Sequence, residues 1–382
     1  MTRKLQLIDA DAHVNPPPVF WDEYLPKHLR GMGPRIEVGA PEDGHDWLVF
    51  EGERKPLSIS SATAGLKKEE YKRVGRQSDM RSGSWEPAAR LEDMGVDGVD
   101  TAVLFGGGPL GTANNELYIA SFEAYNHWLA DFCAYDKKRL VGVAYLPMQD
   151  VDQSIAMLKE AAKRGLNAVN IPAFPQSMGG VMRGSFAAQA LALTGDPDGP
   201  RQYDDPEFDP FWKAAVDHNM GITIHLGARM ARPGVQRFLP NLVMSKVCMA
   251  EPIAIMIFGG VFDRFPDLRF ASIESGVGWF AWMAEYMDGI WHNQRHWTNS
   301  KLDHLPSYYM DHNIYGSFIR DPIGIDNRHK TGGKNIMWST DYPHSETTWP
   351  SSMTIMEEHF AGLSDEERRP IVCDNARKFY AI

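Results

Sequence analysis

Acidic and imidazole side chains stand where short apolar runs of this chain end. The first such run closes with Asp9-Ala10-Asp11-Ala12-His13. Side chains two residues apart share one face of a strand, so a strand here would present Asp11 and His13 side by side. A carboxylate beside an imidazole is a common ligand pair for a divalent metal. On the pair alone, a capping aspartate and a surface histidine are an equally good interpretation.

Two further runs end in the same residue types. The run GITIHLG places His225 where an apolar strand pattern stops, and the run NIMWSTD closes on Asp341, with His344 in the Pro-containing turn that follows. A carboxylate at such a position costs free energy unless it is paired or bound to metal. A lone buried histidine is more often a hydrogen-bonded core residue, but the place of His225 at a strand end favours a ligand. His344 is equally well interpreted as an ordinary loop residue. Three strand ends that carry ligand-type side chains are together much stronger evidence for a metal site than any one of them.

These residues can meet only if their strands end at the same side of the fold. Eight strand-length apolar runs occur, namely LQLID, TAVLF, VGVAYLP, AVNIP, ITIHL, RFASIE, NIYGSF and NIMWSTD. Segments with apolar residues at helical spacing lie between or after them, at Asn114–Tyr135, Val151–Arg164, Phe208–Met220, Pro252–Phe262, Val277–Ile290 and Ser364–Tyr380. The alternation predicts an α/β fold, a (β/α)8 TIM barrel, whose active site lies where the strands end. An open doubly wound sheet is the alternative, which the lack of a GxGxxG motif after the first strand disfavours.

Two segments interrupt the alternation. About 75 residues, rich in Pro, Gly and charge, separate the first run from the second. They have too few periodic apolar residues for a core of their own, so residues 16–87 are expected to form a cap inserted in one barrel domain that spans 1–382. A second excursion, about residues 173–205, follows the fourth run. Both would leave the rim that carries the active site, either as lids or as plain solvent-exposed insertions.

Composition limits the classes of function. The 382 residues carry a net charge of -11, which argues against a nucleic-acid binder and against docking on an anionic membrane. The most apolar stretch, near Ile253–Val261, is too short to span a bilayer, and the start has no signal-peptide pattern. Three distant cysteines, Cys133, Cys248 and Cys373, form no recognisable disulfide or metal pattern, so a reducing, cytoplasmic location is expected. We therefore expect an enzyme whose partner is a small-molecule substrate. Homo-oligomer formation is left open.

Several stretches together resemble the amidohydrolase-2 branch of the amidohydrolase superfamily, the branch of the aminocarboxymuconate-semialdehyde decarboxylase-like enzymes. They are IDADAHVNPP, RLVGVAYLPMQD, GVFDRFPDLRFASIESGVGW, NIMWSTDYPHSETTWP and DNARKFY, and they run from residue 8 to residue 380. The resemblance implies a (β/α)8 barrel with a metal at its mouth. It places the metal ligands of the family on Asp11, His13, His225 and Asp341.

The chain departs from the family pattern at two places. The first-strand motif is often His-x-His in the family, and here it is Asp-x-His. Decarboxylases of the family carry a histidine and glycines after the sixth strand, where this chain has Glu274-Ser275-Gly276. Because that histidine commonly handles a proton, the replacement argues against decarboxylation. Glu274 instead adds a third carboxylate as a metal ligand or catalytic base, and Asn170, at the end of AVNIP, can add a neutral oxygen. The alternative for Glu274 is a plain carboxylate at a helix N-terminus.

Two enzymatic functions follow from this set of residues. A metal-dependent hydrolase would use a metal-activated water, with Asp341 or Glu274 as the base and His344 orienting the substrate. A non-haem di-iron monooxygenase is the alternative, favoured by the number of carboxylates. A decarboxylase and a non-catalytic binding protein rank below both. One or two divalent ions of Zn, Fe or Mn are expected, and the residues do not choose among them.

Overall fold

The computed structural model describes residues 5–175, 200–225 and 238–382. Among them, eight parallel strands form one sheet in the order β1-β5-β6-β7-β8-β9-β10-β11. The strands are β1 (Ile8–Val14), β5 (Thr101–Gly106), β6 (Leu140–Tyr145), β7 (Ala168–Ile171), β8 (Gly221–His225), β9 (Phe270–Ile273), β10 (Ile314–Phe318) and β11 (Ile336–Trp338). Each strand overlaps one of the eight apolar runs read from the sequence. Their residues are buried almost throughout, as expected for parallel strands covered on both faces.

The first and last strands approach each other just beyond β11, which closes the sheet. The amide of Asp341 donates to the carbonyl of Asp11 at 3.0 Å, and the amide of His13 donates to the carbonyl of Tyr342 at 2.6 Å. The expected (β/α)8 barrel is therefore confirmed, and the doubly wound alternative is wrong. Closure also brings residues that are 330 positions apart in sequence to one rim of the barrel.

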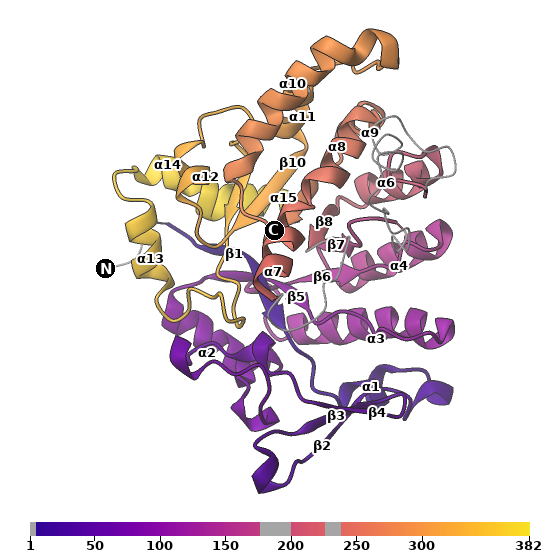
Figure 1. The fold of residues 1–382 in the computed structure, drawn as a ribbon, viewed down its shortest axis with the longest axis vertical. Helices are drawn as coiled ribbons and strands as arrows, with labels where there is room; N and C mark the ends of the chain where they lie inside the picture. Colours follow the sequence, from indigo (N-terminus) through magenta and orange to yellow (C-terminus); the bar gives the residue numbers. More distant parts are fainter. Residues whose placement is uncertain (1–4, 176–199, 226–237) are drawn as a thin grey trace.

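Helices surround the barrel (Figure 1). They are α1 (Phe20–Tyr24), α2 (Pro87–Asp97), α3 (Asn115–Ala134), α4 (Val151–Arg164), α6 (Asp209–Asp217), α7 (Phe238–Val247), α8 (Ala250–Phe258), α9 (Val261–Arg264), α10 (Gly278–Thr298), α11 (Pro306–His312), α12 (Pro322–Asp326), α13 (Ser352–His359), α14 (Asp365–Arg369) and α15 (Asn375–Tyr380). The helix expected at Val151–Arg164 is found with those bounds and ends at Gly165, whose positive φ suits a left-handed C-terminal cap. A capping box formed by Ser364 and Glu367 begins α14.

The helix expected over Pro252–Phe262 is instead two helices, α8 and α9. The break falls at Gly259 and Gly260. A Cβ on Gly259 would lie 2.1 Å from the Cβ of Asp204, and Gly260 has a φ of +68°. Side chains are excluded at the first position by close packing and disfavoured at the second by backbone conformation. Spacing of apolar residues alone cannot reveal either constraint.

Residues between β1 and α2 form the insertion after the first strand. Most of it is irregular, with a small antiparallel sheet of β2 (Arg35–Glu37), β3 (Trp47–Phe50) and β4 (Glu53–Pro56) at one end of the molecule (Figure 1). This sheet buries few side chains. Most of the second excursion, residues 176–199, lies outside the described residues.

We propose that residues 16–87 are a cap that depends on the barrel. The buried residues of α1, Phe20 and Trp21, belong to the core of the barrel domain, and Phe20 packs on Trp128 of α3 at 5.8 Å between ring centroids. The amide of Ala64 donates to the carbonyl of Pro343, and Arg81 forms an ion pair with Asp93. We expect the isolated segment to show no cooperative thermal transition by circular dichroism. A cooperative transition would make it an independent domain.

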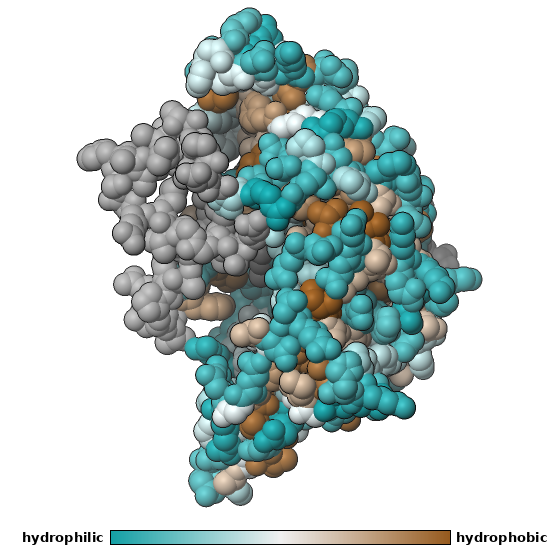
Figure 2. Space-filling view, turned by 90° about the vertical axis from the view of Figure 1, so that its right-hand side faces the viewer, coloured by the Kyte–Doolittle hydropathy of each residue, from teal (hydrophilic) through white to brown (hydrophobic). Residues whose placement is uncertain are grey.

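Figure 2 shows a mainly hydrophilic face with scattered apolar patches. One helical stretch, Phe238–Phe258, is long and apolar enough to cross a membrane by length and composition alone. Its second half, α8, buries Ile253, Met256 and Ile257 in the core, whereas α7 exposes several apolar side chains. By itself such a stretch is weak evidence for a membrane span.

Candidate metal centre

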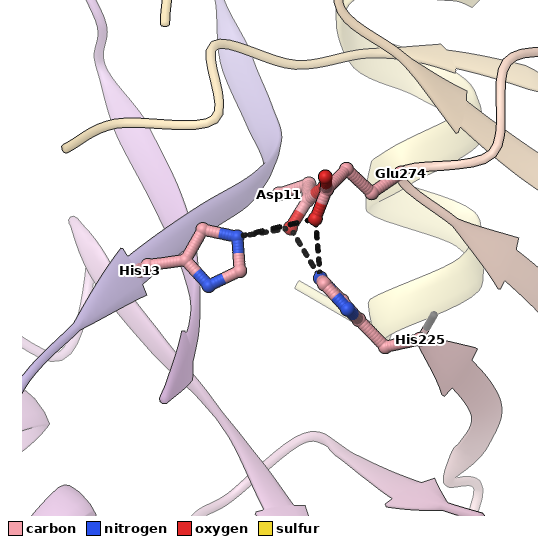
Figure 3. Close-up of side chains that lie close together, drawn as sticks. All are labelled: Asp11, His13, His225 and Glu274. Carbon is pink, nitrogen blue, oxygen red and sulfur yellow. Dashed lines mark hydrogen bonds and ion pairs between the residues drawn. The ribbon is translucent and has the colours of Figure 1, made fainter. Parts of the chain in front are cut away.

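Four side chains from three strands converge at the rim where the strands end (Figure 3). Asp11 and His13 come from β1, His225 ends β8, and Glu274 follows β9. The Oδ1 atom of Asp11 lies 3.2 Å from Nε2 of His225 and 3.3 Å from Nε2 of His13. Oε2 of Glu274 lies 3.6 Å from Nε2 of His225. Ligand atoms of the four residues all lie within 4.8 Å of one another, which is a spacing that one metal ion can bridge.

Asp341 and His344 extend this group. Oδ1 of Asp341 lies 3.1 Å from Nε2 of His13 and 2.8 Å from Nδ1 of His344. The rings of His13 and His344 are stacked with centroids 3.8 Å apart. His13, Glu274, Asp341 and His344 thus form a second set of atoms within 4.8 Å, which shares His13 and Glu274 with the first. The structure brings together the five residues predicted as charged or imidazole metal ligands, Asp11, His13, His225, Glu274 and Asp341.

The backbone is unusual at the two carboxylates that follow strand ends. Glu274 has a φ of +57° and Asp341 a φ of +58°, in the left-handed region that residues with a Cβ rarely adopt. Such conformations cost on the order of 1–3 kcal/mol and persist where surrounding contacts impose them. At both positions the turn leaves the side chain inside the cluster, and neither turn was visible in the sequence.

The donor set suits a divalent cation. Several buried atoms of the cluster have no hydrogen-bond partner of good geometry, among the residues the structure describes: Asp11 Oδ2, His13 Nε2, Glu274 Oε2, Asp341 Oδ1 and Asp341 Oδ2. Buried polar atoms without partners are rare, and together they require a compensating ligand. Two or three imidazoles with three carboxylates are the ligand types of Mn, Fe and Zn sites. The expectation of a divalent metal is therefore confirmed in its general form.

The electrostatics of the cluster also favour positive charge. Burial by itself would lower the pKa of His13, but hydrogen bonds to Asp11 and Asp341 and their negative charges outweigh it and raise the pKa to about 10. Burial would raise the pKa of Asp11, yet the two histidines hold it well below its usual range. Burial, followed by the charge of Asp341, raises the pKa of Glu274. These shifts show that the carboxylates of the cluster favour a positive charge beside them.

Asp9 and Arg90 support the first strand from outside the cluster. Asp9 accepts from the backbone amide of Thr340 at 2.8 Å and from its hydroxyl, which joins β1 to the segment that carries Asp341. Burial raises the pKa of Asp9 to about 7. The buried Arg90 donates to the backbone carbonyl of His13 and stacks on Tyr342 at 4.3 Å. A register shift in the pairing of β1 with β5, between Asp9 and Ala12, lies beside the ligands, where bulges often re-aim side chains.

Lys246 of α7 is a charged neighbour that the sequence analysis missed. Its Nζ lies 2.8 Å from Oε1 of Glu274 and 3.3 Å from Oε2 of Glu346. Desolvation would lower its pKa, but the charge of Glu274 and their hydrogen bond raise it instead. Its position on a helix, rather than at a strand end, gave no signal in the sequence.

Asn170 stands at the end of β7 as expected and is buried. Its Oδ1 accepts a hydrogen bond from the hydroxyl of Thr223 at 3.0 Å. The recorded contact of this amide oxygen is therefore with the neighbouring strand β8, and a role for Asn170 in binding remains a prediction.

An apolar pocket of about 340 Å³ lies between the cap and the loop that follows β5. Its lining includes Trp21, Phe50 and Trp85 of the cap, together with Asn15 and Leu110 from the barrel side. Asn15 is two residues beyond His13 on the same chain segment, so one wall of the pocket begins close to the cluster. This volume is within the usual range for small-molecule sites.

Two sequence relatives are decarboxylases. The chain is 24% identical over 320 residues to gamma-resorcylate decarboxylase of Rhizobium radiobacter, a match that covers 77% of this chain and 86% of that protein. It is 27% identical over 207 residues to 2-amino-3-carboxymuconate-6-semialdehyde decarboxylase of Dictyostelium discoideum, which covers 52% of this chain. The second match spans about half the length of the relative, at 50%.

Solved structures share the barrel. An amidohydrolase from Mycobacterium avium subsp. paratuberculosis superposes with a TM-score of 0.73 at 19% identity and covers 99% of this chain and 100% of its own. A 5-carboxyvanillate decarboxylase from Novosphingobium aromaticivorans, with manganese bound, superposes with a TM-score of 0.68 at 16% identity. That match covers 99% of this chain and 98% of the other. At 19% and 16% sequence identity, these superpositions are evidence for the barrel fold alone.

The expected reaction needs correction. Hydrolysis and the di-iron monooxygenase alternative are both contradicted, because the relatives found by sequence are decarboxylases. The expectation depended on Glu274 replacing the histidine of the family's decarboxylases. A single proton-handling side chain is a weak guide to the reaction, since several residue types can carry a proton at one place.

The resemblance seen in the motifs extends over almost the whole chain. The family model described as amidohydrolase matches residues 8–382, which includes every strand of the barrel and all six residues of the cluster. With the closed barrel and the cluster at its rim, this match confirms the resemblance: the chain belongs to the amidohydrolase family.

Proposed function

We propose that this protein is a metal-dependent decarboxylase that releases CO2 from a small aromatic or unsaturated carboxylic acid. The observation that carries the proposal is the buried cluster of three carboxylates and three histidines at the rim of the barrel, in a chain whose relatives include gamma-resorcylate decarboxylase. The substrate class follows the names of those relatives.

We assign metal binding to Asp11, His13, His225, Glu274 and Asp341. A divalent ion bound by them would act as a Lewis acid that polarises and orients an oxygen of the substrate. Manganese is the first ion to test, because it is bound in the 5-carboxyvanillate decarboxylase of similar fold. Iron and zinc suit the same ligand types.

The reaction replaces a carboxylate with a proton. The bond between the substrate carbon and the carboxyl carbon breaks, CO2 leaves, and the electron pair on the substrate carbon takes up a proton. Asp341 is the candidate that passes on this proton, because Oδ1 of its carboxylate lies 3.1 Å from Nε2 of His13 and 2.8 Å from Nδ1 of His344. His344, partly exposed and bonded to Asp341, is the candidate that returns a proton from solvent.

The cap is proposed to hold the remainder of the substrate. Its pocket is largely apolar and begins at Asn15, close to His13. An apolar wall beside a charged cluster fits a ring that bears a carboxylate, and it keeps water from the carbon that is protonated.

The proposal predicts CO2 release with no requirement for oxygen. The Mn-loaded protein, incubated with 2,6-dihydroxybenzoate and other hydroxylated benzoates, should produce one CO2 for each acid consumed, at equal rates in air and under argon. Product identity is measured by chromatography and CO2 by a coupled assay. Acid consumption without CO2 would reject decarboxylation, and a rate that collapses under argon would reject it as well.

A further inference from the structure

We propose that Lys246 is a positioning residue of the metal centre, which holds one oxygen of Glu274 so that the other is left to bind metal. The inference rests on the metal site proposed above and deepens it. It concerns a residue on α7 that no strand-end pattern points to.

The contacts of Lys246 concentrate on one residue. Its Nζ lies 2.8 Å from Oε1 of Glu274 and 3.0 Å from the backbone carbonyl of Glu274. Its third neighbour is Oε2 of Glu346 at 3.3 Å. An ammonium group has three donors, so two of them are directed to Glu274, one to the side chain and one to the backbone.

Glu274 is held at all of its polar atoms but one. The hydroxyl of Ser317 accepts from its amide at 2.8 Å, and Lys246 occupies its carbonyl and Oε1. Within the part of the chain that the structure describes, Oε2 of this buried residue has no hydrogen-bond partner, and it lies 3.6 Å from Nε2 of His225. The carboxylate therefore presents a single oxygen to the cluster.

The backbone of Glu274 explains why this restraint is needed. With a φ of +57° the residue has a conformation that is unfavourable for a side chain with a Cβ. The bond from Lys246 to the carbonyl of Glu274 stabilises that turn, and the bond to Oε1 fixes the rotamer. Loss of Lys246 would release both the turn and the rotamer of Glu274. Oε2 of Glu274 would then no longer be preorganised to bind the metal.

The charges of the cluster are a second reason to assign a positioning role to Lys246. Asp11, Glu274 and Asp341 lie within one buried cluster, and their repulsion opposes bringing the carboxylates together. Lys246 supplies a positive charge at the side of Glu274 away from the free oxygen. The contact with Glu346 is more exposed, and exposed ion pairs contribute little, about 0–1 kcal/mol.

The test measures metal binding, with no need for a substrate. Mn²⁺ affinity is determined by competition with a fluorescent chelator for the wild type and for Lys246→Met, which keeps the length of the side chain and removes the charge. We expect Kd to rise by about 10–100-fold, the usual effect of losing a group that orients a ligand. The electron paramagnetic resonance spectrum of bound Mn²⁺ should change as well.

Three further variants separate positioning from general stability. Lys246→Arg keeps the charge and should recover affinity to within about tenfold of the wild type. Glu346→Gln removes the other partner of Lys246 and should change affinity by less than about threefold. Ser245→Ala, at the preceding position of α7, removes a hydroxyl bonded within the helix and should have no effect. Thermal melting of each variant identifies any that fails to fold.

A double-mutant cycle decides whether Lys246 acts through Glu274. In the background of Glu274→Gln, Lys246→Met should weaken Mn²⁺ binding little further, because the two changes remove one interaction. Additive losses would overturn the inference, as would unchanged affinity in folded Lys246→Met. In both cases Mn²⁺ binding by the wild type would leave the proposed centre intact. A wild type that binds no divalent ion would reject the centre and this inference together.

Discussion

Replacing His225 with alanine is expected to remove the divalent metal from the protein and to lower decarboxylation at least about a thousandfold. The metal contributes several kcal/mol to the stabilisation of a transition state, and each 1.36 kcal/mol is a factor of ten in rate. The Nε2 atom of His225 lies 3.2 Å from the ligand oxygen of Asp11 and 3.6 Å from that of Glu274. Without this nitrogen, the site would lose the imidazole donor that lies next to the carboxylates of both Asp11 and Glu274.

Elemental analysis of protein purified without chelators gives the measurement. His312→Ala is a suitable control, because His312 is exposed at the end of α11 and its recorded bond is to the backbone carbonyl of Tyr308. Metal per chain should fall to background in His225→Ala and stay at the wild-type value in the control. Equal metal content in the wild type and in His225→Ala would show that the ligand assignment is wrong.

The convergence of Asp11, His13, His225, Glu274 and Asp341 could be predicted because barrel strands are parallel. Once each residue was assigned to the end of a strand, closure of the sheet required all of them to meet at one rim. Neither the distances nor the order around the rim were needed for that conclusion. The spacing of Asp11 and His13 on one strand added a contact that depends only on the alternation of side chains.

Lys246 could not be predicted in this way. It is 28 positions before Glu274 in sequence, on a helix whose placement depends on the path of the chain after β8. The left-handed backbone of Glu274 and Asp341 is likewise imposed by contacts such as those from Ser317 and Asp11. The conformational preferences of Glu and Asp favour other backbone conformations, so the sequence alone does not predict a turn that tertiary contacts impose.

The reaction was harder to predict from the sequence than the position of the site, and the reason is chemical. A metal, three carboxylates and nearby histidines can serve hydrolysis, oxygen activation or decarboxylation, and the choice depends on which substrate bond lies beside the metal. Glu274 argued against decarboxylation, because it stands where the family resemblance places a proton-handling histidine. The proton-transfer role proposed for Asp341, whose Oδ1 lies 2.8 Å from Nδ1 of His344, would not need a histidine at position 274.

Glu274→Gln is expected to fold normally and to lose at least about a hundredfold in activity, the scale of a positioned acid or base and of a lost ligand. Glutamine keeps the volume and the chain length. Folding should be preserved because burial and the charge of Asp341 already disfavour the ionised carboxylate, which is why the pKa of Glu274 is raised. Activity should fall because the amide offers the metal a neutral oxygen in place of a carboxylate.

Metal content and turnover, measured together, distinguish the roles of Glu274. If Glu274 is a ligand, metal per chain falls with activity, and excess Mn²⁺ restores part of both. If it serves the reaction in another way, metal content stays and turnover alone falls. The simplest alternative is a carboxylate that precedes the N-terminus of α10, whose stabilising effect is about 0.3–1 kcal/mol. A variant with wild-type turnover and wild-type metal would support that alternative. The left-handed turn and the unpartnered Oε2 argue against it, because a helix-end carboxylate needs neither of them.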